Sequence, residues 1–321
     1  MNWLGLYSRR ASVSSMGVLR GGLLLATVLL LVAFFATQSP YFLTVGNFLN
    51  IANQLPEIGL LVVGLTFVIL SGAMDLSVGS MVGLAAASVV LLYHAGLNIW
   101  LAVLAAGLVG AACGALNGTL VAYFRMQAVV VTVGTLVFYR GLVYVVTGGR
   151  PQSGLPEEFY VLGQGTFLGL PVNFLILLVV TIGAYIVLTR TLYGRRIYAI
   201  GNNEEALRYS GAPVVAIRFI AFLACGVLSA LSGVLLASRL ASAQATTGQG
   251  FELEAITAVL MGGVHIFGGR GSVIGAFLGL IIIVVLRNGL NMMGVSTVIQ
   301  TLILGVLILV AASVGNASRR I

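Results

Sequence analysis

Lysine is absent from this sequence, and charged residues of every kind are scarce. Of the 321 residues, 60% are hydrophobic and only 7% are charged, whereas about 25% of residues are charged in a typical soluble domain. Sixteen arginines and eight acidic residues cannot cover the surface of a soluble protein of this size. The composition therefore excludes a water-soluble enzyme and a disordered chain, and it favours a protein that folds in the lipid bilayer.

The missing lysine also bears on nucleotide chemistry. The phosphate-binding loop GxxxxGK[ST] needs a lysine for the β- and γ-phosphates, so the chain does not hydrolyse ATP through such a loop. The net charge of +8 is compatible with nucleic-acid binding. However, the arginines lie at the ends of apolar runs and form no basic face, so we expect no nucleic-acid partner.

Side chains suited to catalysis or metal binding are few. Cys113 and Cys225 both lie inside apolar runs, where cysteine acts as a small packing residue. His94 and His265 are far apart in the sequence, and neither has a carboxylate close by in the chain. We therefore expect no catalytic residues, no disulfide, no metal site and no cofactor.

Long apolar runs recur along the chain, and ten are long enough, or nearly so, to cross about 30 Å of hydrocarbon as helices. They lie near residues 20–37, 56–73, 77–95, 98–123, 128–147, 171–189, 217–238, 253–268, 272–294 and 296–315. The short run at 253–268 predicts a tilted or partial span. Because the loops are too short for a second folded domain, we expect an all-α polytopic membrane protein in which residues 1–321 form a single transmembrane domain.

The arginines indicate the orientation. With a cytoplasmic amino terminus, twelve of the sixteen arginines lie in the cytoplasm, as the positive-inside rule requires. They are Arg9, Arg10, Arg20, Arg125, Arg190, Arg195, Arg196, Arg208, Arg218, Arg270, Arg319 and Arg320. Arg150 and Arg239 then lie outside, where they could pair with acids of a partner, and Arg140 and Arg287 lie within spans. We expect cytoplasmic residues 1–19, a retained first span and two cytoplasmic termini.

Glycine is abundant, with 42 residues, and several glycines inside spans are four residues apart, which predicts close helix packing. The pairs are Gly79 and Gly83, Gly110 and Gly114, Gly114 and Gly118, Gly271 and Gly275, and Gly275 and Gly279. In addition, residues 72–84 align without gaps on residues 268–280, with Gly72, Gly79, Gly83 and Leu84 matched. Chance similarity in a glycine-rich chain and a true internal repeat both remain open; a repeat is typical of transporters with broken helices.

The longest polar stretch on the expected cytoplasmic side is residues 190–218, within which we place a coupling segment at 190–216. Asn202 or Asn203 can cap a helix, acidic residues follow in its first turn, and Gly211 with Pro213 ends it. A helix of about two turns is too short to be stable alone. It either docks on a partner or belongs to a solvated loop.

This segment and three others resemble a known family. Residues 205–211, EALRYSG, are similar to the EAA loop of ABC importer permeases, except for leucine at the third position. The wider resemblance extends over residues 35–315 and is to the permease subunits of bacterial ABC importers for ribose and related monosaccharides. It is carried by SPYFLTVGNFLNIANQ (39–54), GLTFVILSGAMDLSVGS (64–80), YGRRIYAIGNNEEALRYSG (193–211) and GQGFELEAITAVLMGGVHIFGGRGSVIGA (248–276).

The resemblance implies a division of labour in the bacterial inner membrane. A periplasmic sugar-binding protein would deliver the sugar, a second permease subunit, identical or homologous, would complete the path among the membrane lipids, and a cytoplasmic ATP-binding cassette subunit would hydrolyse ATP. The chain itself would be a transport subunit and not an enzyme. The residues that match the coupling element are Gly201, Asn203, Glu205, Ala206 and Gly211.

Asp75 and Ser77 fall in SGAMDLSVGS, which is similar to the family's G-x-D-L-S-V-G-S pattern. A carboxylate at the end of an apolar run is costly unless it caps a helix or is paired. We expect Asp75 to be the N-cap of the next span, with Ser77 and Ser80 assisting; a role in gating or in pairing with arginine is the alternative.

Intramembrane polar residues are the candidates for the translocation path, because amide and guanidinium groups can bond sugar hydroxyls. They are Asn117, Arg140, Arg287, Asn288 and Asn291, with Gln300 nearby, and each has a structural bond between helices as its alternative role. Arg287 and Asn291 share one helix face.

Two other functions remain open. A permease for branched-chain amino acids or nucleosides is disfavoured by the expectation that no carboxylate lies near the middle of the membrane. A stand-alone secondary transporter would need a buried acid of its own for coupling, and we expect none near the centre of a span.

Overall fold

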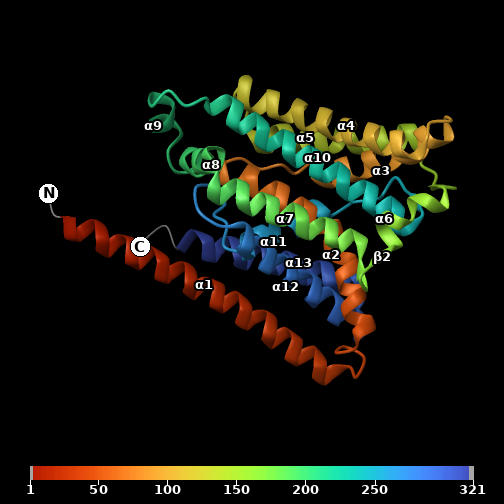
Figure 1. Cartoon of the computed structure of the whole chain (residues 1–321), viewed down its shortest axis with the longest axis horizontal. Coiled ribbons are helices and arrows are strands. Elements are labelled where there is room, and N and C mark those ends of the chain that lie inside the picture. The colour runs from red at the N-terminus through yellow and green to blue at the C-terminus, as the bar shows by residue number, and fades with distance from the viewer. Residues whose placement is uncertain (1–2, 318–321) are drawn as a thin grey trace.

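The computed structural model describes the backbone of residues 3–317 and the side chains of residues 21–310. Of the arginines used for the orientation, Arg319 and Arg320 lie outside the described residues, as do the side chains of Arg9, Arg10 and Arg20. Over the described residues the chain folds as a bundle of helices with four strands of two residues each (Figure 1).

Seven helices of the described part are long and apolar enough to cross a membrane. They are α1 (Trp3–Gln38), α2 (Val45–Leu70), α4 (Ile99–Gly118) continued by the π-helical turn η1 (Thr119–Tyr123), α5 (Ala128–Thr147), α7 (Val172–Arg190), α10 (Val214–Leu240) and α12 (Val273–Met292). The others are α3 (Val78–His94), α6 (Val161–Gln164), α8 (Leu192–Asn202), α9 (Glu204–Tyr209), α11 (Phe251–Met261), α13 (Thr297–Ala317) and the 3₁₀ turn η2 (Glu157–Phe159). Each of the ten predicted runs contains a helix, which confirms the all-α polytopic class.

Two of the helices differ from the apolar runs that predicted them. Helix α2 begins at Val45, although its apolar run begins only at Pro56, because the intervening turns carry polar residues that find partners. Asn47 pairs with Asn288, and the backbone carbonyl of Asn53 accepts a hydrogen bond from Asn173 at 3.0 Å. The run at 253–268 contains only the 11 residues of α11, a length of about 16 Å, so it is a partial span as expected.

Helix α2 lies at the centre of the bundle. From Leu55 to Leu70 every residue is buried, and the helix packs against α7, α10, α11 and α12. A helix that is apolar on all sides must be covered on all sides. Helices α4, α5 and α7 are mostly exposed along their lengths, which is the arrangement expected when lipid covers the outside of a bundle.

Close helix contacts occur where the glycine spacing predicts them. A Cβ atom on Gly110 of α4 would lie 2.5 Å from the carbonyl oxygen of Gly226 on α10, and one on Gly226 would lie 2.3 Å from the carbonyl oxygen of Gly110. One on Gly279 of α12 would lie 2.1 Å from the carbonyl oxygen of Ala258 on α11. These backbones can approach only because the side chains are missing, so the packing prediction is confirmed for these pairs.

Two non-helical breaks meet inside the bundle. Residues 71–77 separate α2 from α3, and residues 262–272 separate α11 from α12. Gly72 and Gly268, which the internal alignment matches, both have positive φ (78° and 85°). A Cβ on Gly268 would lie 2.6 Å from the backbone nitrogen of Gly72, and Gly269 N–H donates to the carbonyl of Leu70 at 3.0 Å. The two segments thus share a helix–break–helix pattern, as an internal repeat would.

The end of the molecule opposite α8 and α9 holds the strands (Figure 1). Strand β1 (Gln152–Ser153) pairs antiparallel with β4 (Ser242–Ala243), and β2 (Thr166–Phe167) pairs with β3 (Leu170–Pro171). The β1–β4 pair joins the two segments that the sequence places on the external side. The start of α1 and the end of α13 lie toward the same end as α8 and α9 (Figure 1).

Candidate functional site

The predicted coupling segment folds as two consecutive helices, α8 and α9. Asn203 is the N-cap of α9, and its side-chain oxygen accepts a hydrogen bond from the backbone N–H of Ala206 at 2.9 Å. Glu204 and Glu205 occupy the first turn, and Gly211 has a φ of 79° just after the helix ends. The predicted cap, acidic first turn and stop are therefore confirmed. Helix α8 is new, since the sequence pattern indicated only one short helix here.

Glu204 fastens α9 to the bundle, whereas the sequence indicated it only as an acid of the first helical turn. Its carboxylate accepts hydrogen bonds from Arg208 and Arg218, each at 2.6 Å. Burial raises the pKa of Glu204, but the hydrogen bonds and charges of Arg218 and then Arg208 outweigh burial, so the pKa lies below its usual range. The neighbouring Glu205 and Ala206 are exposed and available to a partner. The sequence signal was the i,i+4 spacing of Glu204 and Arg208.

Helix α8 contacts the breaks directly. A Cβ on Gly201 would lie 2.1 Å from the nitrogen of Gly269 and 2.2 Å from the carbonyl oxygen of Leu70. The Asn202 side chain donates to the carbonyl of Gly269, and the Tyr198 hydroxyl donates to that of Gly271, both at 3.0 Å. Residues at the end of α2 and in the second break are therefore bound to α8.

Asp75 lies in the first break and is fully buried. Its carboxylate accepts hydrogen bonds from the Ser77 N–H (2.9 Å), the Ser77 hydroxyl (2.6 Å) and the Asn117 amide (3.3 Å). The Tyr139 hydroxyl donates to the Asn117 oxygen at 3.3 Å. The expected N-cap is wrong in one respect: Ser77 is the cap residue of α3, and Asp75 binds it from two positions earlier. Ser80 is buried one turn into α3.

The candidate path residues are hydrogen-bonded to other parts of the chain. Asn117 is bound to Asp75, as described above. Arg140 donates to the backbone carbonyls of Ala245 (2.8 Å), Thr247 (2.7 Å) and Gly79 (3.2 Å). Asn288 pairs with Asn47, and Asn291 accepts a hydrogen bond from Gln300 at 2.7 Å. Each of these side chains holds segments of the chain together, in agreement with the structural alternative.

Two buried acids form ion pairs with arginines of other helices, which the sequence did not predict. Glu57, at the middle of α2, forms an ion pair with Arg239, and Glu254 of α11 forms one with Arg287. The expectation of no carboxylate near the centre of a span is therefore wrong for α2, whereas Glu254 lies in the first turn of α11. Arg239, expected to meet a partner's acid, meets Glu57 of its own chain. The sequence hid these pairs because 182 and 33 residues separate the partners along the chain.

The structure thus defines a polytopic α-helical membrane protein. The short helices α8 and α9 lie at one end of it and are bound to the two breaks. Within the described residues, no group of three or more His, Cys, Asp or Glu side chains could hold a metal ion. No solved structure matches the chain. A family model described as "Branched-chain amino acid transport system / permease component" matches residues 47–312.

Curated proteins match along most of the chain. It is 40% identical to the ribose import permease protein RbsC of Escherichia coli (strain K12), over 91% of this chain and 92% of that protein. It is 40% identical to the ribose import permease of Bacillus subtilis (strain 168), over 88% of each chain. It is 35% identical to the D-allose transport system permease protein AlsC of Escherichia coli (strain K12), also over 88% of each chain. The chain belongs to this permease family, which confirms the resemblance seen in the sequence.

Proposed function

We propose that the chain is the transmembrane permease subunit of an ATP-driven importer and translocates ribose or a related monosaccharide. The 40% identity to ribose import permeases over about nine tenths of the chain carries this proposal. The D-allose permease is less similar, at 35%, so ribose is the first substrate to test. Residues 1–321 then constitute one transmembrane domain.

The arrangement of the coupling segment supports an ATPase on a separate chain as the source of energy. Helices α8 and α9 lie together at one end of the bundle (Figure 1), with Glu205 and Ala206 exposed. The same segment is bound to Leu70, Gly269 and Gly271 at the breaks. A partner that grips the exposed face of α9 can therefore move the two breaks through direct contacts. The partner we propose is a cytoplasmic ATP-binding cassette subunit that docks on the exposed residues Asn203, Glu205, Ala206 and Gly211. Gly201, the fifth residue of the predicted coupling set, faces the breaks and passes the movement on to them.

The other proposed partners complete the importer. A periplasmic sugar-binding protein docks at the opposite end, where β1–β4 joins residues 148–171 and 239–252, and a second permease subunit completes the path. The twelve cytoplasmic arginines support an inner-membrane protein with both termini in the cytoplasm. Within this path, Asn117, Arg140, Arg287, Asn288 and Asn291 act by holding helices in place, and Asp75 with Ser77 holds the first break.

Branched-chain amino-acid transport is the second candidate, because the family description names it. A zwitterion needs one cation and one anion that are free to bind it. Arg287 is already bound to Glu254, and Arg239 to Glu57, so these pairs offer the substrate no unmatched charge. These two pairs therefore give no support to a zwitterionic substrate.

Reconstitution into liposomes tests the proposal. The permease, its ATPase and its binding protein are expected to take up ribose only when ATP is inside, with D-allose and leucine as competing substrates. Uptake of leucine in preference to ribose would assign the second candidate. Ribose uptake that persists without the ATPase would assign a stand-alone secondary transporter, for which the buried Glu57 and Glu254 would be the first residues to examine.

A further inference from the structure

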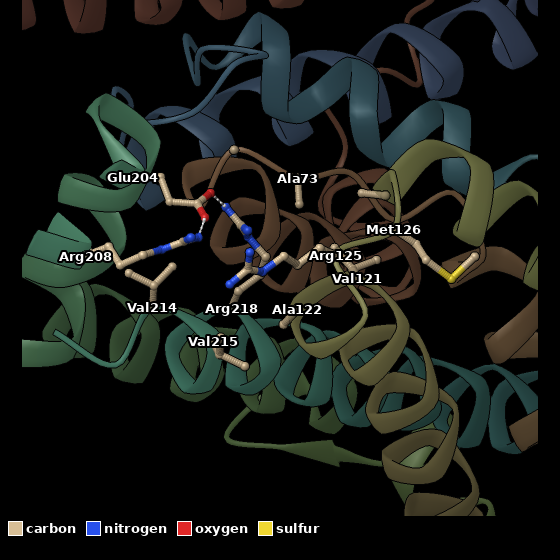
Figure 2. A pocket seen from close by; sticks show the side chains of 12 residues that line it. Ala73, Val121, Ala122, Arg125, Met126, Glu204, Arg208, Val214, Val215 and Arg218 are labelled. Atoms are coloured by element: carbon tan, nitrogen blue, oxygen red, sulfur yellow. Dashed lines mark hydrogen bonds and ion pairs between the residues drawn. The ribbon is translucent and has the colours of Figure 1, made fainter. Parts of the chain in front are cut away.

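A pocket of about 340 Å³ lies beside Glu204, between the coupling segment and the ends of the spans. Figure 2 shows the side chains that line it, among them Ala73 from the first break, Arg125 and Met126 before α5, Arg208 from α9 and Arg218 from α10. Arg208 lies within the predicted coupling segment 190–216, but none of these residues is among the individual coupling or path residues that the sequence indicated.

The pocket carries excess positive charge. Three guanidinium groups, of Arg125, Arg208 and Arg218, point toward the same space beside one carboxylate, that of Glu204 (Figure 2). Glu204 is shared by Arg208 and Arg218, whereas Arg125 forms no ion pair within the part of the chain that the structure describes. The Nε of Arg218 is buried and has no hydrogen-bond partner there. Three positive charges against one negative charge leave an excess of two, which favours the binding of an anion.

The pocket lies at the level where the spans end. Ala73 follows the last residue of α2 by three positions, Met126 precedes the first residue of α5 by two, and Val214 is the first residue of α10. Next to Arg125, the side chains of Tyr123 and Phe124 are 60% and 69% exposed. Exposed aromatic side chains at helix ends are typical of the membrane–water interface, which is where lipid phosphates lie.

We propose that this pocket binds the phosphate of an anionic phospholipid head group. Guanidinium groups recognise phosphate through paired, charge-assisted hydrogen bonds, and basic pockets between membrane helices bind lipid head groups. Soluble phosphate esters share this chemistry, but the location at the helix ends favours lipid. Because Arg208 and Arg218 also bind Glu204, an occupied pocket holds α9 against α10. Anionic lipid then acts on the coupling segment itself.

Lipid binding to the full chain tests the proposal. The permease in phosphatidylcholine nanodiscs is titrated with phosphatidylglycerol and, separately, with glycerol 3-phosphate, and bound ligand is counted by native mass spectrometry. Arg125→Gln is expected to weaken phosphatidylglycerol binding about tenfold, the effect of losing one charge-assisted bond. Arg190→Gln is the matched control, since Arg190 is an exposed arginine at the end of α7 that does not line the pocket. The affinity of this variant for phosphatidylglycerol is expected to equal that of the wild type.

The outcomes separate the sources of the phosphate. Binding of phosphatidylglycerol that Arg125→Gln weakens and Arg190→Gln does not would support the proposal. Equal affinities in both variants, or no binding of either ligand, would overturn it. Binding of glycerol 3-phosphate without phosphatidylglycerol would overturn the assignment to lipid. The measurement uses neither the ATPase nor the sugar, so its result is independent of the proposed transport function.

Discussion

Arg218 of α10 connects Glu204 of α9 with the first break. Its guanidinium donates to the Glu204 carboxylate at 2.6 Å and to the carbonyl of Ser71 at 3.2 Å. Gly72, next in the chain, lies against Gly268 of the second break. A displacement of α9 therefore reaches both broken helices through one ion pair and one backbone contact.

Glu204→Gln removes the charge that Arg208 and Arg218 share. We expect the variant to assemble, but its ATP-driven ribose uptake to fall roughly threefold to tenfold, because partly exposed ion pairs contribute up to about 1 kcal/mol each. Uptake into liposomes measures the effect. Gly183→Ala is the control, as no atom lies within 4 Å of the Cβ that it adds to α7. Equal uptake in both variants would contradict the role of Glu204.

Glu205→Ala tests the exposed face of α9. Glu205 is exposed and lies in the first turn after the Asn203 cap, so its removal is expected to leave the fold and the melting temperature unchanged. The stimulation of ATPase activity by sugar-loaded binding protein is expected to fall, because the docking contact is lost. An unchanged stimulation in liposomes would count against docking at this residue.

Gly201→Ala places a methyl group where none fits. The added Cβ would meet the nitrogen of Gly269 at 2.1 Å and the carbonyl oxygen of Leu70 at 2.2 Å, both backbone atoms that cannot swing away. We expect a lower melting temperature and loss of ATP-driven uptake. Gly183→Ala, on a face of α7 with no atom within 4 Å of the added Cβ, should behave as the wild type. Normal uptake by Gly201→Ala would show that α8 and the breaks are not tightly packed.

Asp75→Asn replaces one carboxylate oxygen with an amide nitrogen. The buried carboxylate accepts from Ser77 and Asn117, and the new amide cannot accept every one of these bonds. We expect a loss of about 1–3 kcal/mol in the free energy of unfolding, measured by denaturant titration in detergent. Ser88→Ala is the comparison, because the Ser88 hydroxyl bonds only to Leu84 of its own helix. A loss no larger than that of Ser88→Ala would rule out a structural role for Asp75.

Arg287→Gln leaves Glu254 without its ion-pair partner, and the side chain of Glu254 is only 12% exposed. We expect a loss on the order of 2 kcal/mol in the free energy of unfolding and slower uptake, since an unpaired buried charge costs more than a missing pair. The double variant Glu254→Gln with Arg287→Gln is expected to recover much of the loss. Should the double variant prove less stable than the single one, the pair is not the reason for the loss.

The local sequence predicts most of the helices. The apolar runs predict every membrane helix, and the order Asn203, two acids and Gly211 predicts the limits of α9, because capping and turn preferences act within a few residues. The start of α2 was missed for the same reason. Asn47 and Asn53 lower the local hydropathy, so the apolar run starts after them. In the fold, Asn47 pairs with the side chain of Asn288, and the backbone carbonyl of Asn53 accepts a hydrogen bond from Asn173.

The residue types of the candidate path residues did not reveal what these side chains bind. An asparagine or arginine in an apolar run must find a polar partner, and the sequence does not say whether that partner is a substrate or another helix. Asn117, Arg140, Arg287, Asn288 and Asn291 are all bound within the chain. The ion pairs of Glu57 and Glu254 were missed because each acid lies near the start of its apolar run, where an acid is usually part of a loop.

The sequence by itself determined that this protein belongs in a bilayer, that it is helical, and that a capped helix interrupts the spans near Glu205. These properties follow from composition and short-range periodicity, which depend only on neighbouring residues. The tertiary structure decided which charges are paired, how α8 and α9 bind the two breaks, and where Arg125 joins two other arginines around a pocket. Those relationships depend on helices distant in the chain packing side by side, and glycine contacts such as that of Gly110 with Gly226 set the distances at which they meet.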